Sequence, residues 1–449
     1  MHYDLIIKNA ALVTVKEIIK CDIAVSGGFV AKTGELECCD TADEIYDAAG
    51  KYVLPGIIDT HVHFRDPGLT EKEDFETGSL SAAMGGITMI ADMPNVMPVT
   101  STARRFNEKV DIIKEKSYID FALFALLNND NLSEMEELKK AGALGFKVFL
   151  AASTGDLTFP SPPILMKQME KSASLGSRVC FHCETTEINQ NFTEVAKKET
   201  DSPDGFWLDY ARPVISEVYA IKAAINFAIH SKAKIHILHV TSADGISMID
   251  EARQIEAPNT PDVTVETCPH YLLLTNSQGE VHKVYPPLRD ETHCDGLWQA
   301  LSEGIIDMIA SDHAPHTIEE KSLPLWEAPA GLCGVETMLP LLLNEVNKGN
   351  LSLNDIVRLC SEAPAKIWGI YHRKGNLLPG ADADITIVDM NVKKTIRYSD
   401  LHSKSKTSPY DGMEVQGAPV ATIVRGNFVM KDGKLTGKKG YGTLISPAL

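Results

Sequence analysis

The stretch "IIDTHVHFRDPG" at residues 57–68 decides the fold. An apolar pair leads into His61 and His63, which stand two residues apart. Side chains two apart on a β-strand point to the same face, so both imidazoles can bind one metal ion. The stretch therefore predicts a buried strand that ends at a metal site.

The same arrangement of a buried strand followed by a helix recurs about eight times along the middle of the chain. Apolar runs such as "GFKVFL" (145–150) and "KIHILHV" (234–240) alternate with helical segments such as "NLSEMEELKKAG" (131–142). Repeated alternation with fully apolar strands predicts an α/β protein, a parallel (β/α)₈ barrel of the TIM type.

The two chain ends have a different style, with short strands and tight turns. Asp432-Gly433 lies between two apolar runs and predicts a hairpin, whereas residues 404–412 predict a polar loop. We expect residues 1–52 and 375–449 to build one small β-sandwich together, with the barrel at 53–374 inserted between them.

Composition narrows the partners and the compartment. The formal net charge is 43 − 61 = −18, which disfavours nucleic acid or an anionic membrane as a partner. The nine cysteines are odd in number and lie mostly in apolar runs, so we expect reduced thiols and a cytoplasmic protein. Cys180-x-x-Cys183 resembles half a zinc knuckle, but without a second pair we expect core packing.

Several predicted strands end on a residue type that binds metals. Singly, each has an ordinary explanation: Lys147 could reach the barrel rim, a lone histidine could sit hydrogen-bonded in the core, and Asp312 could cap a helix. A barrel brings the ends of its strands together, so jointly they predict one site. The candidates are His61, His63, Lys147, His182, His239 and Asp312.

Lys147 needs a separate explanation, because an ammonium group cannot bind a metal. A desolvated lysine loses its proton more easily. Beside a metal it could then react with carbon dioxide, and the resulting carbamate would be an anionic bridging ligand.

These motifs resemble those of the amidohydrolase superfamily and, within it, the cyclic amidases: dihydroorotase, allantoinase, and dihydropyrimidinase or hydantoinase. The blocks "GFKVFL", "HCE", "HVTS", "CPHYL", "PPLRD" and "SDHAPH" follow one another in the family order. The resemblance implies two Zn²⁺ per chain, one bound by His61, His63 and Asp312, the other by His182 and His239. Carboxylated Lys147 and a hydroxide would bridge them, and Asp312 would be the catalytic proton shuttle.

Arg65 and two other residues indicate a substrate carboxylate. Arginine offers a fixed, bidentate cation, and dihydroorotases hold their substrate with residues that match Arg65, Asn95 and His316. The resemblance therefore favours dihydroorotase, which interconverts dihydroorotate plus water with N-carbamoyl-aspartate in pyrimidine biosynthesis. In the alternative explanation, Arg65 pairs with Asp66 or Glu73, and Asn95 only forms a turn.

Other features leave the identity of the substrate ring undecided. Tyr285 stands where dihydroorotases have asparagine, and "CPHY" (268–271) and "KTSPYDG" (406–412) look more like allantoinases or hydantoinases. Allantoinase and hydantoinase or dihydropyrimidinase remain alternatives. A non-catalytic scaffold ranks lower, because such relatives lose metal ligands and this chain keeps all six.

Two loops rich in glycine and proline, at 153–163 and 321–332, follow strand ends and predict a lid over the substrate. By resemblance, the Ala330-Gly331 backbone would contact the substrate ring, and the position of Tyr285 would contribute mostly backbone contacts to the substrate. The resemblance also implies a homo-oligomer, a dimer or a tetramer.

Overall fold

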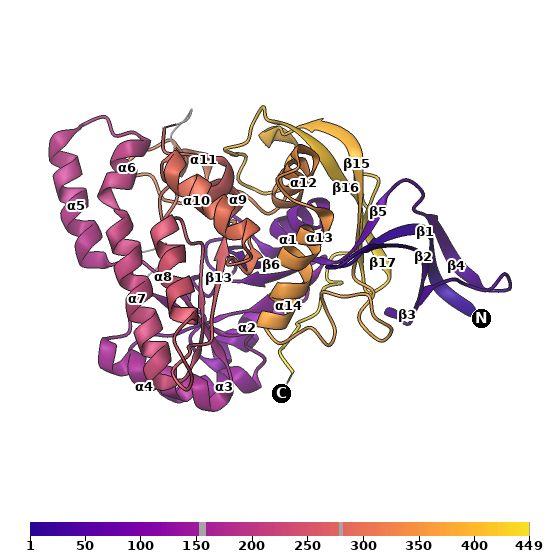
Figure 1. Ribbon diagram of the computed structural model, residues 1–449, viewed down its shortest axis with the longest axis horizontal. Coiled ribbons are helices and arrows are strands. Elements are labelled where there is room, and N and C mark those ends of the chain that lie inside the picture. The colour runs from indigo at the N-terminus through magenta and orange to yellow at the C-terminus, as the bar shows by residue number, and fades with distance from the viewer. Residues whose placement is uncertain (152–158, 278–281, 449) are drawn as a thin grey trace.

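Parallel strands alternate with helices through the middle of the chain in the computed structural model, which describes residues 1–151, 159–277 and 282–448 (Figure 1). These strands pair in the orders β6-β7-β8 and β9-β10-β11-β12-β13-β14. They are β6 (Ile57–Val62), β7 (Ile87–Asp92), β8 (Asp120–Leu123), β9 (Ala125–Leu126), β10 (Phe146–Phe149), β11 (Arg178–His182), β12 (Lys234–Ile237), β13 (Val263–Thr267) and β14 (Met308–Ile309).

The two groups of strands close into the predicted barrel. β8 and β9 are separated by one residue, so together they join the groups on one side. On the other side, Val62 and His313 form a parallel bridge, and the His63 N–H donates to the His313 carbonyl at 2.8 Å. Every residue of β6, β7, β10 and β11 is buried, as expected for strands covered on both faces.

Helices surround the barrel, and several begin with the capping residues that their sequences provide. Asp74 accepts hydrogen bonds from the N–H groups of Glu76 and Thr77 at the start of α1. The helices are α1 (Phe75–Met84), α2 (Ala103–Ile113), α3 (Met135–Lys140), α4 (Pro162–Leu175), α5 (Thr186–Glu199), α6 (Gly205–Ala211), α7 (Val214–Ser231), α8 (Ala243–Arg253), α9 (Pro269–Leu273), α10 (Glu291–Ser302), α11 (Ile318–Lys321), α12 (Met338–Lys348), α13 (Leu353–Val357) and α14 (Ala363–Ile367). Among the described residues, no helix has the length and hydropathy needed to cross a membrane.

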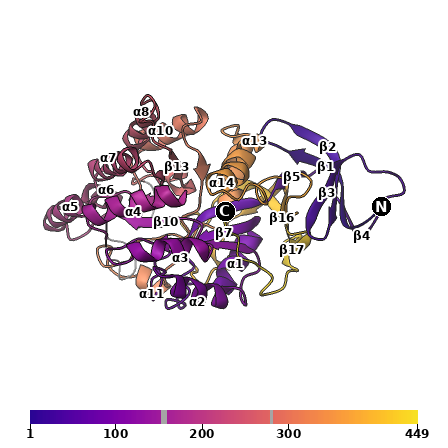
Figure 2. The ribbon, with the colours of Figure 1, turned by 90° about the horizontal axis from the view of Figure 1, so that it is seen from below.

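The two chain ends build a second β layer together, as predicted. Its strands run in the order β18-β17-β16-β15-β5-β1-β2-β3, with β4 paired to β1. They are β1 (His2–Val13), β2 (Ile18–Ser26), β3 (Phe29–Gly34), β4 (Thr41–Asp47), β5 (Tyr52–Pro55), β15 (Ile385–Thr395), β16 (Glu414–Val424), β17 (Asn427–Lys431) and β18 (Lys434–Leu435). Figure 2 shows β1 to β4 on the far side of the molecule from α4 and α5.

Antiparallel pairing of β5 with β15 joins the N-terminal and C-terminal strands. The predicted hairpin is present between β17 and β18, where Asp432 and Gly433 both have positive φ, at 50° and 72°. Two central residues of this kind give the turn that matches the twist of paired strands. The domain boundaries at residues 52 and 375 stay a prediction.

Candidate metal centre and active site

A cavity of about 470 Å³ opens at the carboxyl ends of the barrel strands. It is lined by all twelve residues that the sequence proposed: His61, His63, Arg65, Asn95, Lys147, His182, His239, Tyr285, Asp312, His316, Ala330 and Gly331. Ten further residues line it, of which Trp326, Glu327, Ala328 and Pro329 belong to the predicted lid at 321–332. The sequence did not propose the other six: Lys72, Phe149, Arg212, Lys283, Val284 and Ala314.

His61, His63 and Asp312 form a buried cluster with the spacing of metal ligands. Asp312 Oδ1 lies 3.3 Å from the Nε2 atoms of both His61 and His63. Donors bound tetrahedrally at about 2.05 Å from one zinc ion lie about 3.3 Å apart. Both distances from Asp312 therefore match those of ligands that share one metal ion.

Hydrogen bonds orient both imidazoles of this cluster. His61 Nδ1 donates to Glu266 Oε1 at 2.6 Å, and His63 Nδ1 donates to Asn95 Oδ1 at 2.8 Å. The Nε2 lone pairs are therefore left for a metal. Burial lowers the pKa of His61 to about 3 and that of His63 to about 4, so both rings are neutral near pH 7.

A second pair of histidines lies at the ends of two neighbouring strands, His182 on β11 and His239 two residues after β12. His182 Nδ1 is 3.0 Å from His239 Nε2, and the His61 and His239 rings are 5.2 Å apart between centroids. His182 Nε2 donates to Glu184 Oε2 at 2.7 Å, and Arg212 Nε binds Glu184 Oε1 at 2.7 Å. This chain of contacts leaves His182 Nδ1 as the free electron-pair donor.

Lys147 lies in the cavity wall with no exposed surface, so the explanation in which it reaches the barrel rim is wrong. Its Nζ has no hydrogen-bond partner among the described residues and lies 4.4 Å from the Phe149 ring centroid. Burial lowers its pKa. His61 Nε2 is likewise buried without a hydrogen-bond partner in the described chain, so both atoms fit a site completed by metal.

Three site residues have a backbone conformation that L-residues avoid. The φ angles are 63° at Arg65, 39° at His239 and 45° at Asp312. Such conformations cost about 1–3 kcal/mol each and persist where surrounding contacts fix them. Asp312 lies beside the seam that closes the barrel, and it caps no helix, since α11 begins six residues later behind Thr317.

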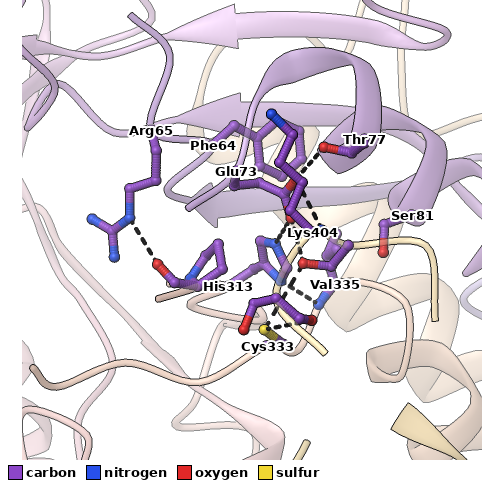
Figure 3. A network of polar contacts seen from close by, with 12 residues as sticks. Phe64, Arg65, Glu73, Thr77, Ser81, His313, Cys333, Val335 and Lys404 are labelled. Carbon is purple, nitrogen blue, oxygen red and sulfur yellow. Dashed lines mark hydrogen bonds and ion pairs between the residues drawn. The ribbon is translucent and has the colours of Figure 1, made fainter. Parts of the chain in front are cut away.

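A buried polar network surrounds His313, the residue that follows Asp312 (Figure 3). The N–H groups of Gly334 and Val335 donate to His313 Nδ1 at 3.2 and 3.4 Å. The proton of this ring is therefore on Nε2, which faces Glu73 Oε2 at 3.5 Å. Glu73 also accepts a hydrogen bond from the Ser403 hydroxyl, so the network links the barrel rim to residues far along the chain.

The explanation in which Arg65 pairs with Asp66 or Glu73 is wrong. Asp66 pairs with Lys116 at 2.6 Å, and the Arg65 guanidinium points away from Glu73 in Figure 3. Arg65 Nε donates to the Pro315 carbonyl at 3.2 Å, and Nη2 lies 3.3 Å from His316 Nε2. Arg65 forms no ion pair with a carboxylate in the part of the chain that the structure describes.

The predicted lid at 321–332 lies over the cavity, where residues 326–331 form part of the wall. Lys321 Nζ donates to the carbonyls of Lys283, Pro329 and Gly331 at 3.2, 3.2 and 3.0 Å. Lys283 Nζ donates to the Leu325 carbonyl at 2.7 Å. Most of the other predicted lid, at 153–158, lies outside the described residues.

Two remaining predictions concern Tyr285 and the cysteine pair. Tyr285 lines the cavity, and the Arg212 guanidinium stacks 3.6 Å from its ring centroid. Cys180 and Cys183 are buried free thiols, as expected for core packing.

The family model described as the amidohydrolase family matches residues 52–429. The chain belongs to the amidohydrolase family. The predicted resemblance is therefore confirmed, and the protein is a hydrolase of this family.

The similar proteins reported next cover 90% or more of the chain. An L-hydantoinase of Paenarthrobacter aurescens is 37% identical over 99% of this chain and 98% of its own. A dihydroorotase of Methanothermobacter thermautotrophicus is 36% identical over 90% and 89%, and an allantoinase of Deinococcus radiodurans is 35% identical over 100% and 99%. The solved structure of an L-hydantoinase (dihydropyrimidinase) from Arthrobacter aurescens superposes with a TM-score of 0.94, at 36% identity, covering 99% of this chain and 100% of that one.

Proposed function

We propose that this amidohydrolase opens a cyclic amide whose ring bears a carboxylate, and that its reaction is that of a dihydroorotase. Dihydroorotate plus water would give N-carbamoyl-aspartate, and the same groups would serve the reverse reaction. The hydantoinase, dihydroorotase and allantoinase relatives act on three kinds of cyclic amide, so the residues of the site distinguish the substrate ring.

The buried guanidinium of Arg65 carries the proposal. Arg65 is 1% exposed, and burial lowers its pKa to about 10, so it is still a cation near pH 7. A buried cation is costly unless an anion compensates it. A substrate carboxylate can supply that anion, with His316 and Asn95 as neighbours in the cavity wall.

The residues fit a metal pair. His61, His63 and Asp312 would bind one Zn²⁺, His182 and His239 the other, and Lys147, carboxylated on its unpartnered Nζ, would bridge them. Imidazole nitrogens and carboxylate oxygens are the donors that zinc takes in catalytic sites. When bound, the metals would lower the pKa of a water molecule and polarise the scissile carbonyl.

Asp312 is the residue placed to move protons. Burial opposes its ionisation, but the neighbouring imidazoles, His61 first, hold its pKa well below the ordinary value. An ionised carboxylate at this position can accept a proton from the attacking water and pass it to the leaving ring nitrogen. The Ala330-Gly331 backbone and Tyr285 line the wall where the ring would lie.

Hydantoinase activity is the second candidate. The L-hydantoinase relative covers the chain end to end, and Tyr285 departs from the dihydroorotase pattern. A neutral ring, however, would leave the Arg65 guanidinium without an anion, which is why we place this candidate second.

Turnover of dihydroorotate, hydantoin, allantoin and dihydrouracil, measured side by side, tests the proposal. Arg65→Met should lower kcat/KM for dihydroorotate by the equivalent of about 2–5 kcal/mol of transition-state binding. It should leave kcat/KM for the neutral rings nearly unchanged. Arg104→Met, at an exposed arginine paired with Glu108, is the matched control. Wild-type preference for a neutral ring, or unchanged dihydroorotate turnover in Arg65→Met, would refute the dihydroorotase proposal.

A further inference from the structure

Lys72 is a second buried cation at the carboxylate end of the cavity, and the reaction described above gives it no role. It lies between β6 and α1, is 9% exposed, and lines the cavity. Its Nζ is 2.7 Å from Glu320 Oε1 and 3.3 Å from His316 Nδ1. The lysine is therefore held between a carboxylate and an imidazole.

An ammonium group has three hydrogen-bond donors and no acceptor. His316 Nδ1 must therefore accept the hydrogen bond from Lys72, which places the ring proton on Nε2. His316 Nε2 is 3.1 Å from the Ala330 carbonyl, an acceptor that suits this N–H. Burial, with the nearby charges of Arg65 and Lys72, lowers the pKa of His316 to about 2, so the ring is neutral.

The opposite tautomer has weaker support. It would send Nδ1–H to Glu320 Oε2, at 3.4 Å, and let Nε2 accept from Arg65 Nη2, at 3.3 Å. Glu320 is already engaged, because Oε1 holds Lys72 and Oε2 accepts the Thr317 N–H at 3.1 Å in the capping box of α11. The shorter contacts, 3.3 and 3.1 Å, belong to the Nε2–H form.

The choice of tautomer matters for an anionic substrate. An Nε2–H beside the Arg65 guanidinium can share its hydrogen bond between the Ala330 carbonyl and a substrate carboxylate, whereas an Nε2 lone pair would repel the carboxylate. We infer that Lys72, held by Glu320, is a positioning residue that fixes neutral His316 as an Nε2–H donor, so that His316 and Arg65 together bind the substrate carboxylate. This inference rests on the proposed function for the identity of the anion, but not for the state of His316.

The state of His316 is measured directly by nitrogen NMR on the zinc-loaded protein with ¹⁵N-labelled histidine, the signal being assigned with His316→Asn. In the wild type, Nδ1 should give the shift of an unprotonated nitrogen and Nε2 that of an N–H. Lys72→Met should lose this preference, and Lys283→Met, which removes another cavity-lining lysine, should keep it. A wild-type ring protonated on Nδ1 would overturn the inference.

Steady-state kinetics test whether the Nε2–H form of His316 contributes to binding of the substrate carboxylate. Lys72→Met should raise KM for dihydroorotate about 10- to 100-fold, the worth of one hydrogen bond to a charged group, with a smaller change in kcat and none for hydantoin. In a His316→Asn background, Lys72→Met should add little, because it acts through that ring. Additive effects of the two changes would refute positioning.

The two proposals fail differently. A wild-type enzyme that turns over hydantoin but not dihydroorotate would remove the proposed function, while the nitrogen shifts would still decide whether Lys72 sets the tautomer. Normal dihydroorotate turnover with the Nδ1–H tautomer would leave the proposed function standing and remove the role of Lys72.

Discussion

Lys147 lines the cavity. Its Nζ is buried and has no hydrogen-bond partner among the described residues. We expect Lys147→Ala to lower zinc from about two ions per chain to one or fewer and to abolish most turnover, because the bridging ligand is lost. The vacated space should accept a short carboxylic acid, so acetate or propionate should restore part of the activity. Metal analysis of the purified variant checks this, and full metal content with full activity would exclude the bridge.

Asp312 is expected to serve both as ligand and as proton shuttle. Asp312→Asn keeps the shape but removes the charge and the base, so turnover should fall by about 10²- to 10⁴-fold and zinc should bind more weakly. Asp59→Asn is the matched control, since Asp59 is buried on β6, does not line the cavity, and accepts hydrogen bonds at Oδ1 from the Ser311 and His61 N–H groups. A near-normal kcat in Asp312→Asn would remove both roles.

At the residue scale, the sequence predicted the site residues that stand at strand ends. It missed the residues that form hydrogen bonds to them. His61, His63 and Asp312 followed from period two and from barrel geometry. Glu266 is the second-to-last residue of β13 and could have been found by the same rule. Lys72 could not, because it stands in the run "EKEDFE" (71–76), where a charged residue usually faces water.

The 321–332 loop is positioned over the cavity by lysine side chains rather than by regular structure. Lys321→Met removes the group that binds the loop carbonyls of Pro329 and Gly331 and ties them to the Lys283 carbonyl, so the Ala330-Gly331 backbone should lose its fixed position. We expect KM to rise about 3- to 10-fold for acidic and neutral rings alike, since backbone contacts do not depend on a carboxylate. Steady-state kinetics on dihydroorotate and hydantoin check this.

Lys232→Met is the control for that loop variant, because Lys232 likewise donates to a loop carbonyl, that of Pro258 at 3.0 Å, and does not line the cavity. Unaltered KM values in Lys321→Met would mean that the loop holds its position without this lysine.

At the element scale, the pattern of strands and helices predicted the barrel, but it could not predict which distant segments touch. Residues 404–412 were expected to be a polar loop. In the structure, the neighbouring Ser403 hydroxyl donates to Glu73, and Lys404 Nζ binds Asp74 Oδ2 at 2.6 Å. The contact spans 330 residues of sequence, and nothing in the local pattern of either segment specifies it.

At the scale of the molecule, charge is distributed unevenly. The net charge is −18, yet Arg65, Lys72, Arg212 and Lys283 all line one cavity. The composition therefore described the surface and said little about the site, where buried cations and metals would set the local potential. An anionic substrate is compatible with an acidic protein for this reason.

A buried ion cluster joins the barrel to the sheet built by the chain ends. Lys374 Nζ lies 2.6 Å from Asp120 Oδ2 on β8, 2.8 Å from Asp382 Oδ2 and 2.6 Å from Asp384 Oδ2, just before β15. Lys374 is 1% exposed, and the three carboxylates are buried as well. Arg425 on the sheet side also contacts Asp120, so the cluster holds carboxylates from both layers.

Lys374→Met should therefore destabilise the whole protein. Removing one partner from a buried ion cluster leaves uncompensated charge and costs about 3–5 kcal/mol. Lys431→Met, which breaks the partly exposed pair with Glu44, should cost less than about 1 kcal/mol. Urea unfolding of the zinc-loaded variants, followed by circular dichroism, gives the comparison. None of the cluster residues lines the cavity, so folded Lys374→Met should keep wild-type KM values. Equal unfolding midpoints for Lys374→Met and Lys431→Met would show that the buried ion cluster does not hold the two layers together.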